Sequence, residues 1–248
     1  MAKKENNVLI IGAGDVGGAL SVVLKKNYKI FIIDKKTKDK YLGKSFTVAH
    51  ICFPFDKSFV DSCVEYIKAY KPEITIINST VAVGTTEKII KETGESPVVH
   101  SPIMGDHNQL CKSIKTFTKT IGASNKRWGK TALEHFRRAG LKTKLFDNPK
   151  TTELGKLLLT TQFALNIAFH QEMERLCKKF DVDFNESIVE MKKIFNNGYV
   201  IFRPNVIMPN LFPGKIGGSC LMQNIAILEK QYRSDFFETI KRSNGKKK

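Results

Sequence analysis

The chain has 248 residues, 42% hydrophobic and 26% charged, which is ordinary for a globular protein that buries one or two cores. Its net charge of +17 comes from lysines spread along the whole sequence, with no basic stripe interleaved with aromatic residues, so nucleic-acid binding is not expected as the main role. No apolar run approaches the roughly 20 residues that span a bilayer, no secretory signal opens the chain and the five cysteines form no CxxC pair, so we expect a cytoplasmic protein with reduced thiols, no membrane contact and no metal site.

The first part of the sequence alternates short apolar strands with amphipathic helices. A strand from Asn7 leads through a glycine turn into a helix, and the segments that follow alternate in the same way. This alternation is typical of an α/β Rossmann fold, a doubly wound parallel sheet with helices on both faces, and we assign it to residues 1–148. The further predicted strands are 29–34, 45–53, 74–80, 96–102, 115–123 and the edge strand 141–146, and the predicted helices between them are 61–70, 85–93 and 125–140.

A smaller all-helical domain is predicted for residues 149–235. Asn148 is a suitable N-cap and Pro149 suits the first helical position of one long helix that runs to about Phe180. A helix of about twice the usual length favours a homodimer interface. A second helix over 184–195, a loop rich in proline and glycine over 196–220, a closing helix over 221–232 and a basic tail over 236–248 complete the prediction.

The first glycine turn has the pattern of a dinucleotide-binding loop. Gly12 would make the tight turn, Gly14 would let the backbone approach a pyrophosphate and Gly17 would let helix and strand pack closely. Asp34 ends the next strand, where its carboxylate would accept hydrogen bonds from the adenosine ribose and repel a 2′-phosphate, so NAD is favoured over NADP. The other residues that we place at the cofactor are Asp15, Val16, Lys35, Pro54, Ser79 and Thr80.

Three later segments follow this turn in a fixed order. They are Asn78-Ser-Thr-Val-Ala-Val-Gly-Thr-Thr86, Glu153-Leu-Gly-Lys-Leu-Leu-Leu-Thr-Thr161 and Gly217-Gly-Ser-Cys220. With them the sequence resembles the UDP-glucose/GDP-mannose dehydrogenase family, whose members use NAD to oxidise a sugar CH₂OH to a carboxylate in two hydride transfers. The resemblance implies a small anionic substrate such as a nucleotide sugar.

The resemblance also implies roles for individual residues. Cys220 matches the cysteine that adds to the aldehyde intermediate, and Lys156 matches the lysine that stabilises the oxyanion. Thr80 matches the threonine at the nicotinamide end of the cleft. The residues implied at the substrate are Arg203, whose spacing to the cysteine is longer by one than in the family, together with Thr160, Gly217 and Gly218.

Three polar positions depart from the family pattern. The family's proline-glutamate pair is Pro102-Ile103 here, the asparagine one turn after the lysine is Thr160, and the aspartate four residues after the cysteine is Asn224. We keep Asn224 in the catalytic set, although its amide cannot act as a base. The family also carries a further C-terminal domain, and only residues 228–248 follow the cysteine helix here. These departures favour a single oxidation of an alcohol to an aldehyde or ketone.

Other interpretations remain open. His100 follows a predicted strand at the carboxyl edge of the sheet, where His100 or His107 could take a substrate proton. This segment resembles the HPM loop of prephenate dehydrogenases, so an enzyme like these or like 6-phosphogluconate dehydrogenases is one alternative, and a catalytically silent NAD-binding module is another. Cys220 is either a nucleophile or a buried thiol. We expect packing roles for Cys52, Cys63, Cys111 and Cys177, and surface or interface positions for His135 and His170.

Overall fold

The computed structural model describes residues 6–217 and 220–247. The chain divides into two compact units, Met1–Lys156 and Leu157–Lys248. Helix α6, Pro149–Lys179, begins in the first unit and continues into the second. Of the described helices, none combines the length and the apolar composition needed to cross a membrane.

The first unit is built on a seven-stranded sheet with the order β2-β1-β3-β4-β5-β6-β7. Neighbouring strands are parallel, except that β5 and β6 are antiparallel. Because β1 has β2 on one side and β3 on the other, the chain changes direction across the sheet at β1, which places a ligand crevice at the carboxyl ends of β1 and β3. The strands are β1 (Asn7–Ile11), β2 (Lys29–Ile33), β3 (Val48–Ile51), β4 (Ile74–Ile77), β5 (Val98–His100), β6 (Lys119–Gly122) and β7 (Thr143–Phe146).

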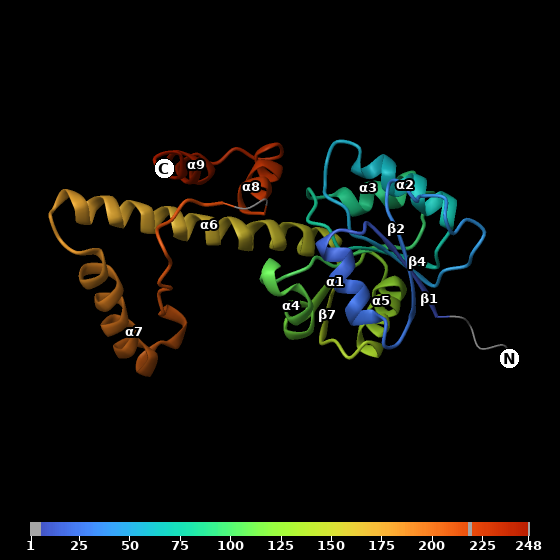
Figure 1. Ribbon diagram of the computed structural model, residues 1–248, viewed down its shortest axis with the longest axis horizontal. Helices are drawn as coiled ribbons and strands as arrows, with labels where there is room; N and C mark the ends of the chain where they lie inside the picture. Colours follow the sequence, from blue (N-terminus) through green and yellow to red (C-terminus); the bar gives the residue numbers. More distant parts are fainter. Residues whose placement is uncertain (1–5, 218–219, 248) are drawn as a thin grey trace. The chain divides into compact units, whose positions relative to one another are not determined.

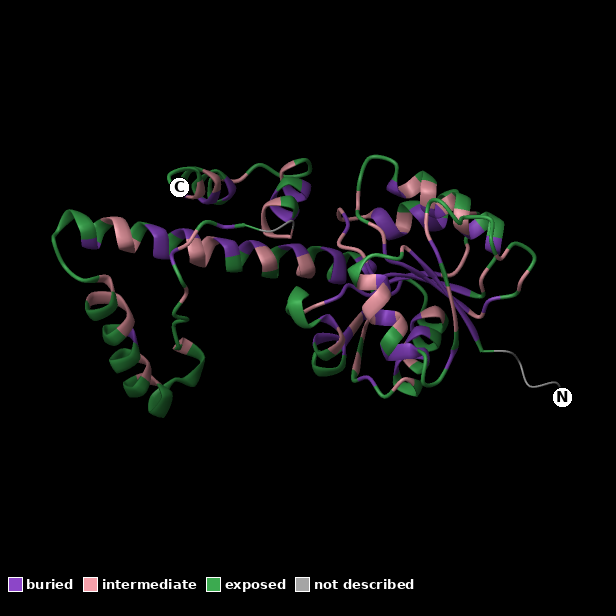
Figure 2. Cartoon of the chain, viewed as in Figure 1, coloured by how far each residue is buried: buried purple, intermediate pink, exposed green. Residues whose placement is uncertain are grey.

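Helices cover both faces of this sheet, so the prediction of a doubly wound α/β fold is confirmed (Figure 1). Alternate residues of β1 serve the two cores: Val8 and Ile10 pack with Phe136 in one, and Leu9 and Ile11 pack with Phe59 in the other. The central strands β1, β3, β4 and β5 are accordingly buried along their whole length, whereas the edge strands β2 and β7 are largely half-buried or exposed (Figure 2). Helices α2 (Phe59–Tyr70) and α3 (Thr85–Glu92) lie on one face, and α1 (Asp15–Leu24), α4 (Leu110–Thr116) and α5 (Lys126–Arg138) lie on the other.

The second unit is helical. It contains the remainder of α6 and three later helices, α7 (Met191–Phe202), α8 (Leu221–Glu229) and α9 (Asp235–Gly245). A π-helical segment, η2 (Asn185–Glu190), runs directly into α7, and a 3₁₀ turn, η3 (Pro204–Val206), follows it. The first unit also contains a three-residue 3₁₀ turn, η1 (His107–Gln109).

Several predicted boundaries were wrong. The helix predicted over 184–195 continues to Phe202, because the Asn196 side chain bonds both the N–H and the C=O of Met208 at 2.9 Å and so ties the last turns of α7 to the following segment. The strand predicted over 115–123 is divided, with α4 ending at Thr116 and only β6 extended. The first compact unit includes the first turns of α6 as far as Lys156, and these turns bond to the rest of that unit, as described below.

The segment predicted as a basic tail forms helix α9 instead. Ser234 caps it by accepting a hydrogen bond from the N–H of Phe236 at 3.3 Å. Phe237 and Ile240 are then 6% and 0% exposed, one turn apart on the buried face. Lysine-rich composition concealed this short amphipathic pattern.

Candidate functional site

The glycine turn after β1 has the geometry that its sequence predicted. Gly12 has φ +110°, and an added Cβ there would lie 2.9 Å from backbone atoms of Cys52 and Phe53. A Cβ at Gly17 would lie 1.9 Å from the carbonyl oxygen of Gly12, so only glycine lets α1 approach β1 this closely. Gly14, the N-cap of α1, has open space at its Cβ position. The turn therefore presents an uncovered helix N-terminus, which suits a phosphate.

Asp34 follows β2 at the same edge of the sheet. Its Oδ1 accepts hydrogen bonds from the N–H of Lys36 at 2.9 Å and from the N–H and the hydroxyl of Thr37 at 3.1 Å. The Lys36 hydrogen bond, with those from Thr37, holds the pKa of the Asp34 carboxyl below its ordinary value. Within the described part of the chain, Oδ2 accepts no hydrogen bond, so an ionised oxygen remains for a ribose hydroxyl.

The other residues predicted at the cofactor lie around this edge. Asp15 occupies the first turn of α1, and Pro54 follows β3. Ser79 follows β4, and its hydroxyl donates to the carbonyl oxygen of Phe53 at 2.6 Å, which joins the loops after β3 and β4. Asp15, Lys35 and Pro54 are exposed, whereas Val16, Ser79 and Thr80 are half-buried.

Glu153 is a buried carboxylate to which the sequence analysis assigned no role. It is 0% exposed, and it accepts hydrogen bonds from the N–H of Gly84 at 2.7 Å and from the N–H and hydroxyl of Thr86 at 2.8 and 2.6 Å. Burial raises the pKa of Glu153, while these hydrogen bonds oppose the rise. The carboxylate thereby caps the N-terminus of α3 and holds the loop that carries Ser79 and Thr80. The sequence feature that could have indicated a role for Glu153 is its position three residues before Lys156, on the same helix.

His100 does not have the freedom that an acid-base role requires. Its ring is 0% exposed, Nδ1 lies 2.8 Å from Oγ1 of Thr152, and Nε2 lies 3.1 Å from the carbonyl oxygen of Ser79. Burial lowers the pKa of His100 to about 3. The ring is therefore a neutral group that joins β5, α6 and the Ser79 loop. His107 is exposed on η1.

Lys119, the first residue of β6, is a buried ammonium that the sequence analysis missed. It is 4% exposed, and Nζ donates to the carbonyl oxygens of Ser101 and Pro102 at 2.8 and 3.0 Å. Burial, together with the charge of Lys156, lowers the pKa of Lys119 from 10.5 to about 7. Ile103, where the family has glutamate, is 9% exposed and packs in a core. The end of β5 therefore carries a buried amine, and Ile103 supplies no carboxylate there.

We expect Lys119→Met to flatten the pH dependence of stability above neutral pH. In the wild type the unfolded chain binds more protons than the folded chain between pH 7 and 10.5, so stability rises with pH in that range, by at most about 1.4 kcal/mol per pH unit. Urea unfolding of the first unit at several pH values measures this slope. Lys144→Met, an exposed lysine on β7, should keep the wild-type slope; equal slopes in all three proteins would contradict the pKa of Lys119.

His135 and His170 are buried, at 5% and 4% exposure, so the prediction of surface positions was wrong. His135 Nε2 lies 3.0 Å from Nε2 of His50, whose Nδ1 lies 3.0 Å from the amide nitrogen of Asn78. Burial lowers the pKa of His135 to about 3 and that of His50 well below its ordinary value. In the second unit, His170 Nε2 accepts from Lys192 at 2.6 Å. Both histidines are therefore structural links between helices and their neighbours.

Cys220 directly precedes α8 and is half-buried, and its carbonyl oxygen accepts from the N–H of Asn224 at 3.0 Å. Asn224 is 4% exposed, and its amide donates to the hydroxyl of Thr160 at 3.0 Å. Two of the three positions that depart from the family pattern therefore touch each other. They form a neutral pair in which neither side chain can act as a base at neutral pH.

The segment before Cys220 is fixed by side chains of α6 and α9. Gln171 donates to the carbonyl oxygen of Gly214 at 2.7 Å. Asn244 accepts from the N–H of Ile216 at 2.7 Å and donates to its carbonyl oxygen at 3.1 Å. The backbone N–H and C=O of Ile216 are thus both hydrogen-bonded to the same side-chain amide. Gly217 is described and exposed, whereas Gly218 lies outside the described residues.

The predicted site residues are distributed over both units. Thr80, His100 and Lys156 belong to the first, whereas Thr160, Arg203, Cys220 and Asn224 belong to the second. Lys156 is half-buried, one turn after Glu153, and Arg203 is exposed at the end of α7. Of the four other cysteines, Cys52, Cys63 and Cys177 are buried and Cys111 is half-buried. Within residues 6–217 and 220–247, no three His, Cys, Asp or Glu side chains are grouped to hold a metal ion.

Comparison with known proteins gives a consistent assignment. Residues 150–245 match the sequence profile of the UDP-glucose/GDP-mannose dehydrogenase family, central domain, so the predicted resemblance is confirmed. The UDP-N-acetyl-D-mannosamine dehydrogenase of Methanococcus vannielii is 28% identical over 196 residues, which cover 77% of this chain and 43% of that protein. The chain therefore spans less than half the length of the curated relatives that it matches.

Solved structures share the fold. The UDP-D-ManNAc dehydrogenase from Pyrococcus horikoshii superposes with a TM-score of 0.80 at 20% identity, covering 96% of this chain and 68% of that one. The 3-hydroxyisobutyrate dehydrogenase from Mycobacterium tuberculosis gives a TM-score of 0.69 at 11% identity, covering 97% of this chain and 92% of that one. At these identities the likeness establishes the architecture.

Proposed function

Because residues 150–245 match the sequence profile of the central domain of the UDP-glucose/GDP-mannose dehydrogenase family, we propose that this chain is an NAD-dependent oxidoreductase that oxidises a hydroxyl of a sugar nucleotide. The observation that carries the proposal is the glycine turn, in which Gly12 and Gly17 have no room for a side chain while Gly14 is open. The alternative of an enzyme like prephenate dehydrogenases or 6-phosphogluconate dehydrogenases loses the support of His100, whose ring is buried and has partners at both nitrogens.

The first unit fits NAD. The N-terminus of α1 would receive the diphosphate, and Oδ2 of Asp34 would accept from the adenosine ribose. Thr80 and Ser79 would line the nicotinamide end, held by the hydrogen bonds of Glu153 to the rest of their loop. NAD supplies a hydride acceptor when it is bound.

The residues proposed to act on the reacting hydroxyl of the substrate follow the first turn of α6. We assign Lys156 to the developing alkoxide, because a cation placed where negative charge builds up lowers the barrier. Cys220, which directly precedes α8, corresponds to the nucleophile that captures an aldehyde in the family. Thr160, Arg203, Gly217 and Gly218 are proposed to contact the substrate.

The neutral Asn224–Thr160 pair and the apolar Ile103 favour one oxidation over two. Hydrolysis of a thioester needs a group that activates water, and both positions where the family has a carboxylate lack one here. The product is then an aldehyde or ketone, formed with one NADH for each substrate molecule.

The test is a screen of nucleotide sugars for NADH formation, with the carbonyl product trapped and counted against NADH. A ratio of one supports the single oxidation, whereas a ratio of two with a carboxylate product would contradict it. NAD binding by calorimetry without turnover on any nucleotide sugar would instead identify the catalytically silent module.

We also propose that the chain forms a homodimer through α6 and α7. Both helices present large apolar side chains to solvent: Leu159 and Phe163 are 56% and 48% exposed on α6, and Ile194 and Ile201 are 64% and 76% exposed on α7. Patches of this kind on a folded chain favour association, and a second copy offers the same apolar surface.

The dimer is tested by sedimentation at micromolar concentration. The wild type should sediment at twice the chain mass of 28.0 kDa, and Phe163→Asp should shift it to the monomer, because a carboxylate would be buried unpaired. Val22→Asp, an apolar residue 48% exposed on α1, should leave the dimer intact. A monomeric wild type would refute the proposal.

A further inference from the structure

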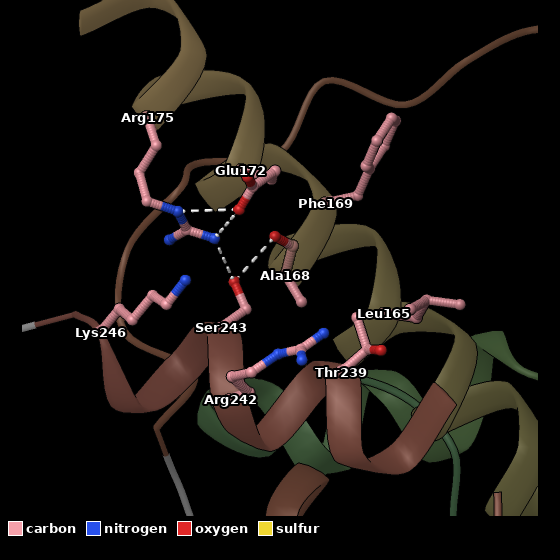
Figure 3. Close-up of a pocket in the computed structure, with 9 residues that line it drawn as sticks. All are labelled: Leu165, Ala168, Phe169, Glu172, Arg175, Thr239, Arg242, Ser243 and Lys246. Carbon is pink, nitrogen blue, oxygen red and sulfur yellow. Dashed lines mark hydrogen bonds and ion pairs between the residues drawn. The ribbon is translucent and has the colours of Figure 1, made fainter. Parts of the chain in front are cut away.

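A cavity of about 320 Å³ lies between α6 and α9 within the second unit (Figure 3). Its volume is in the range of small-molecule pockets. Leu165 and Phe169 of α6 provide apolar surface, whereas the charged groups come from both helices. None of these residues belongs to the cofactor or catalytic sets described above.

The charges at this cavity do not balance. Arg175, Arg242 and Lys246 are cationic, and Glu172 is the carboxylate among the residues that line it. Arg175 already pairs with Glu172, its Nε lying 2.8 Å from Oε2. Over residues 6–217 and 220–247, the side chains of Arg242 and Lys246 make no hydrogen bond or ion pair. Two positive charges therefore face this cavity without a partner.

The pKa of Glu172 agrees with an excess of positive charge at the cavity. The Arg175 hydrogen bond lowers the pKa of Glu172, and the charges of Lys246 and Arg242 lower it further. Both unpaired cations are thus close enough to act on a group inside the cavity. Thr239 and Arg242 are three residues apart on α9, and Lys246, the helical C-cap of α9, follows Arg242 by four residues, so all three side chains lie on one helix face.

Arg175 is fixed before any ligand arrives. Its Nη2 donates to the hydroxyl of Ser243 at 2.8 Å, and that hydroxyl lies 3.1 Å from the carbonyl oxygen of Ala168 and 2.8 Å from Oε1 of Gln171. Ser243 is 7% exposed, so the bond is made inside the contact between α6 and α9. A guanidinium held in this way loses little freedom on binding an anion.

We propose that this cavity binds a small phosphorylated molecule, with its phosphate among Arg175, Arg242 and Lys246 and its uncharged portion against Leu165 and Phe169. Guanidinium and ammonium groups form strong charge-assisted hydrogen bonds with phosphate oxygens. The hydroxyl of Thr239 adds a neutral donor. The site is separate from the proposed reaction, and it stands whether or not the chain turns over a nucleotide sugar.

Titration of the full isotope-labelled chain with inorganic pyrophosphate tests the site by amide chemical shifts. We expect saturable shifts at residues 239–246 and 165–175. Arg242→Gln/Lys246→Gln should weaken the affinity at these residues by at least about tenfold, because two charge-assisted contacts are lost. Both side chains are exposed, so the variant should keep the wild-type spectrum elsewhere.

Lys230→Gln/Arg233→Gln is the matched control. It also removes one lysine and one arginine charge, from exposed positions of the same unit that lie outside the cavity, and should keep the wild-type affinity for pyrophosphate. Shifts confined to residues 12–17, which contain the glycine turn, would overturn the proposal. Equal weakening in both double variants would overturn it as well, since it would identify nonspecific attraction to a chain of net charge +17.

Discussion

Replacing Lys156 by methionine should lower kcat for NAD reduction by about 10²–10³-fold, while the affinity for NAD stays unchanged. The ammonium is proposed to act on charge that develops in the transition state, so its loss should appear in kcat more than in KM. Methionine keeps the unbranched shape and the helix propensity of lysine, so α6 should fold as before. NADH formation with an accepted nucleotide sugar, and calorimetry with NAD, measure the two quantities.

Lys150→Met supplies the control for this loss. Lys150 is on the same helix, 47% exposed, and pairs with Glu87 at 2.7 Å on the surface. Its removal also takes one positive charge from the first turns of α6, so a general electrostatic effect would appear in both variants. Wild-type kcat in Lys156→Met would show that the ammonium does not stabilise the oxyanion.

Glu153→Ala should destabilise the first unit by about 3–5 kcal/mol, because it leaves the N–H groups of Gly84 and Thr86 buried without an acceptor. Glu153→Gln should cost less, since its one carbonyl oxygen can still accept, although its amide group then faces a donor. Thermal and urea unfolding followed by circular dichroism measure both losses.

The surface pair Lys88–Glu92, 3.7 Å apart on α3, gives the comparison for Glu153. Glu92→Ala removes a carboxylate from α3, the helix that Glu153 caps. The expected change in the free energy of unfolding is below about 0.5 kcal/mol, because an exposed pair contributes little. NAD affinity should also fall in Glu153→Ala, since the loop with Ser79 and Thr80 loses its anchor. A Glu153→Ala protein as stable as Glu92→Ala would contradict the capping role.

Local patterns in the sequence predicted the first unit well. The sheet follows from short apolar segments separated by helices, and the steric roles of Gly12, Gly14 and Gly17 follow from a motif whose geometry is fixed by backbone contacts. The boundaries were less certain where composition misleads. Helix α9 ends directly before the run Lys246-Lys-Lys248, and α7 contains Asn196, Asn197 and Gly198, so neither segment looked helical from its composition.

The partners of buried polar groups could not be predicted from sequence, because they depend on contacts between distant segments. Glu153 bonds to residues 67 and 69 positions away, and His50 meets His135 across 85 positions. Lys119 did carry a signal, since it lies two residues before the buried Ile121 and so on the same face of β6. A lysine at such a position is expected to bury its amine.

The amide that holds Ile216 belongs to an Asn-Gly dipeptide, Asn244-Gly245, the sequence most prone to spontaneous deamidation. Succinimide formation needs the Gly245 nitrogen to attack the Asn244 side chain, a geometry that a helical backbone and two occupied hydrogen bonds oppose. The rate at which Asn244 deamidates would therefore report how often α9 opens. Mass spectrometry of stored protein would measure this rate. Each deamidated molecule would have lost the donor to Ile216 and gained a negative charge beside its carbonyl oxygen, so chemical damage here would loosen the segment that leads to Cys220.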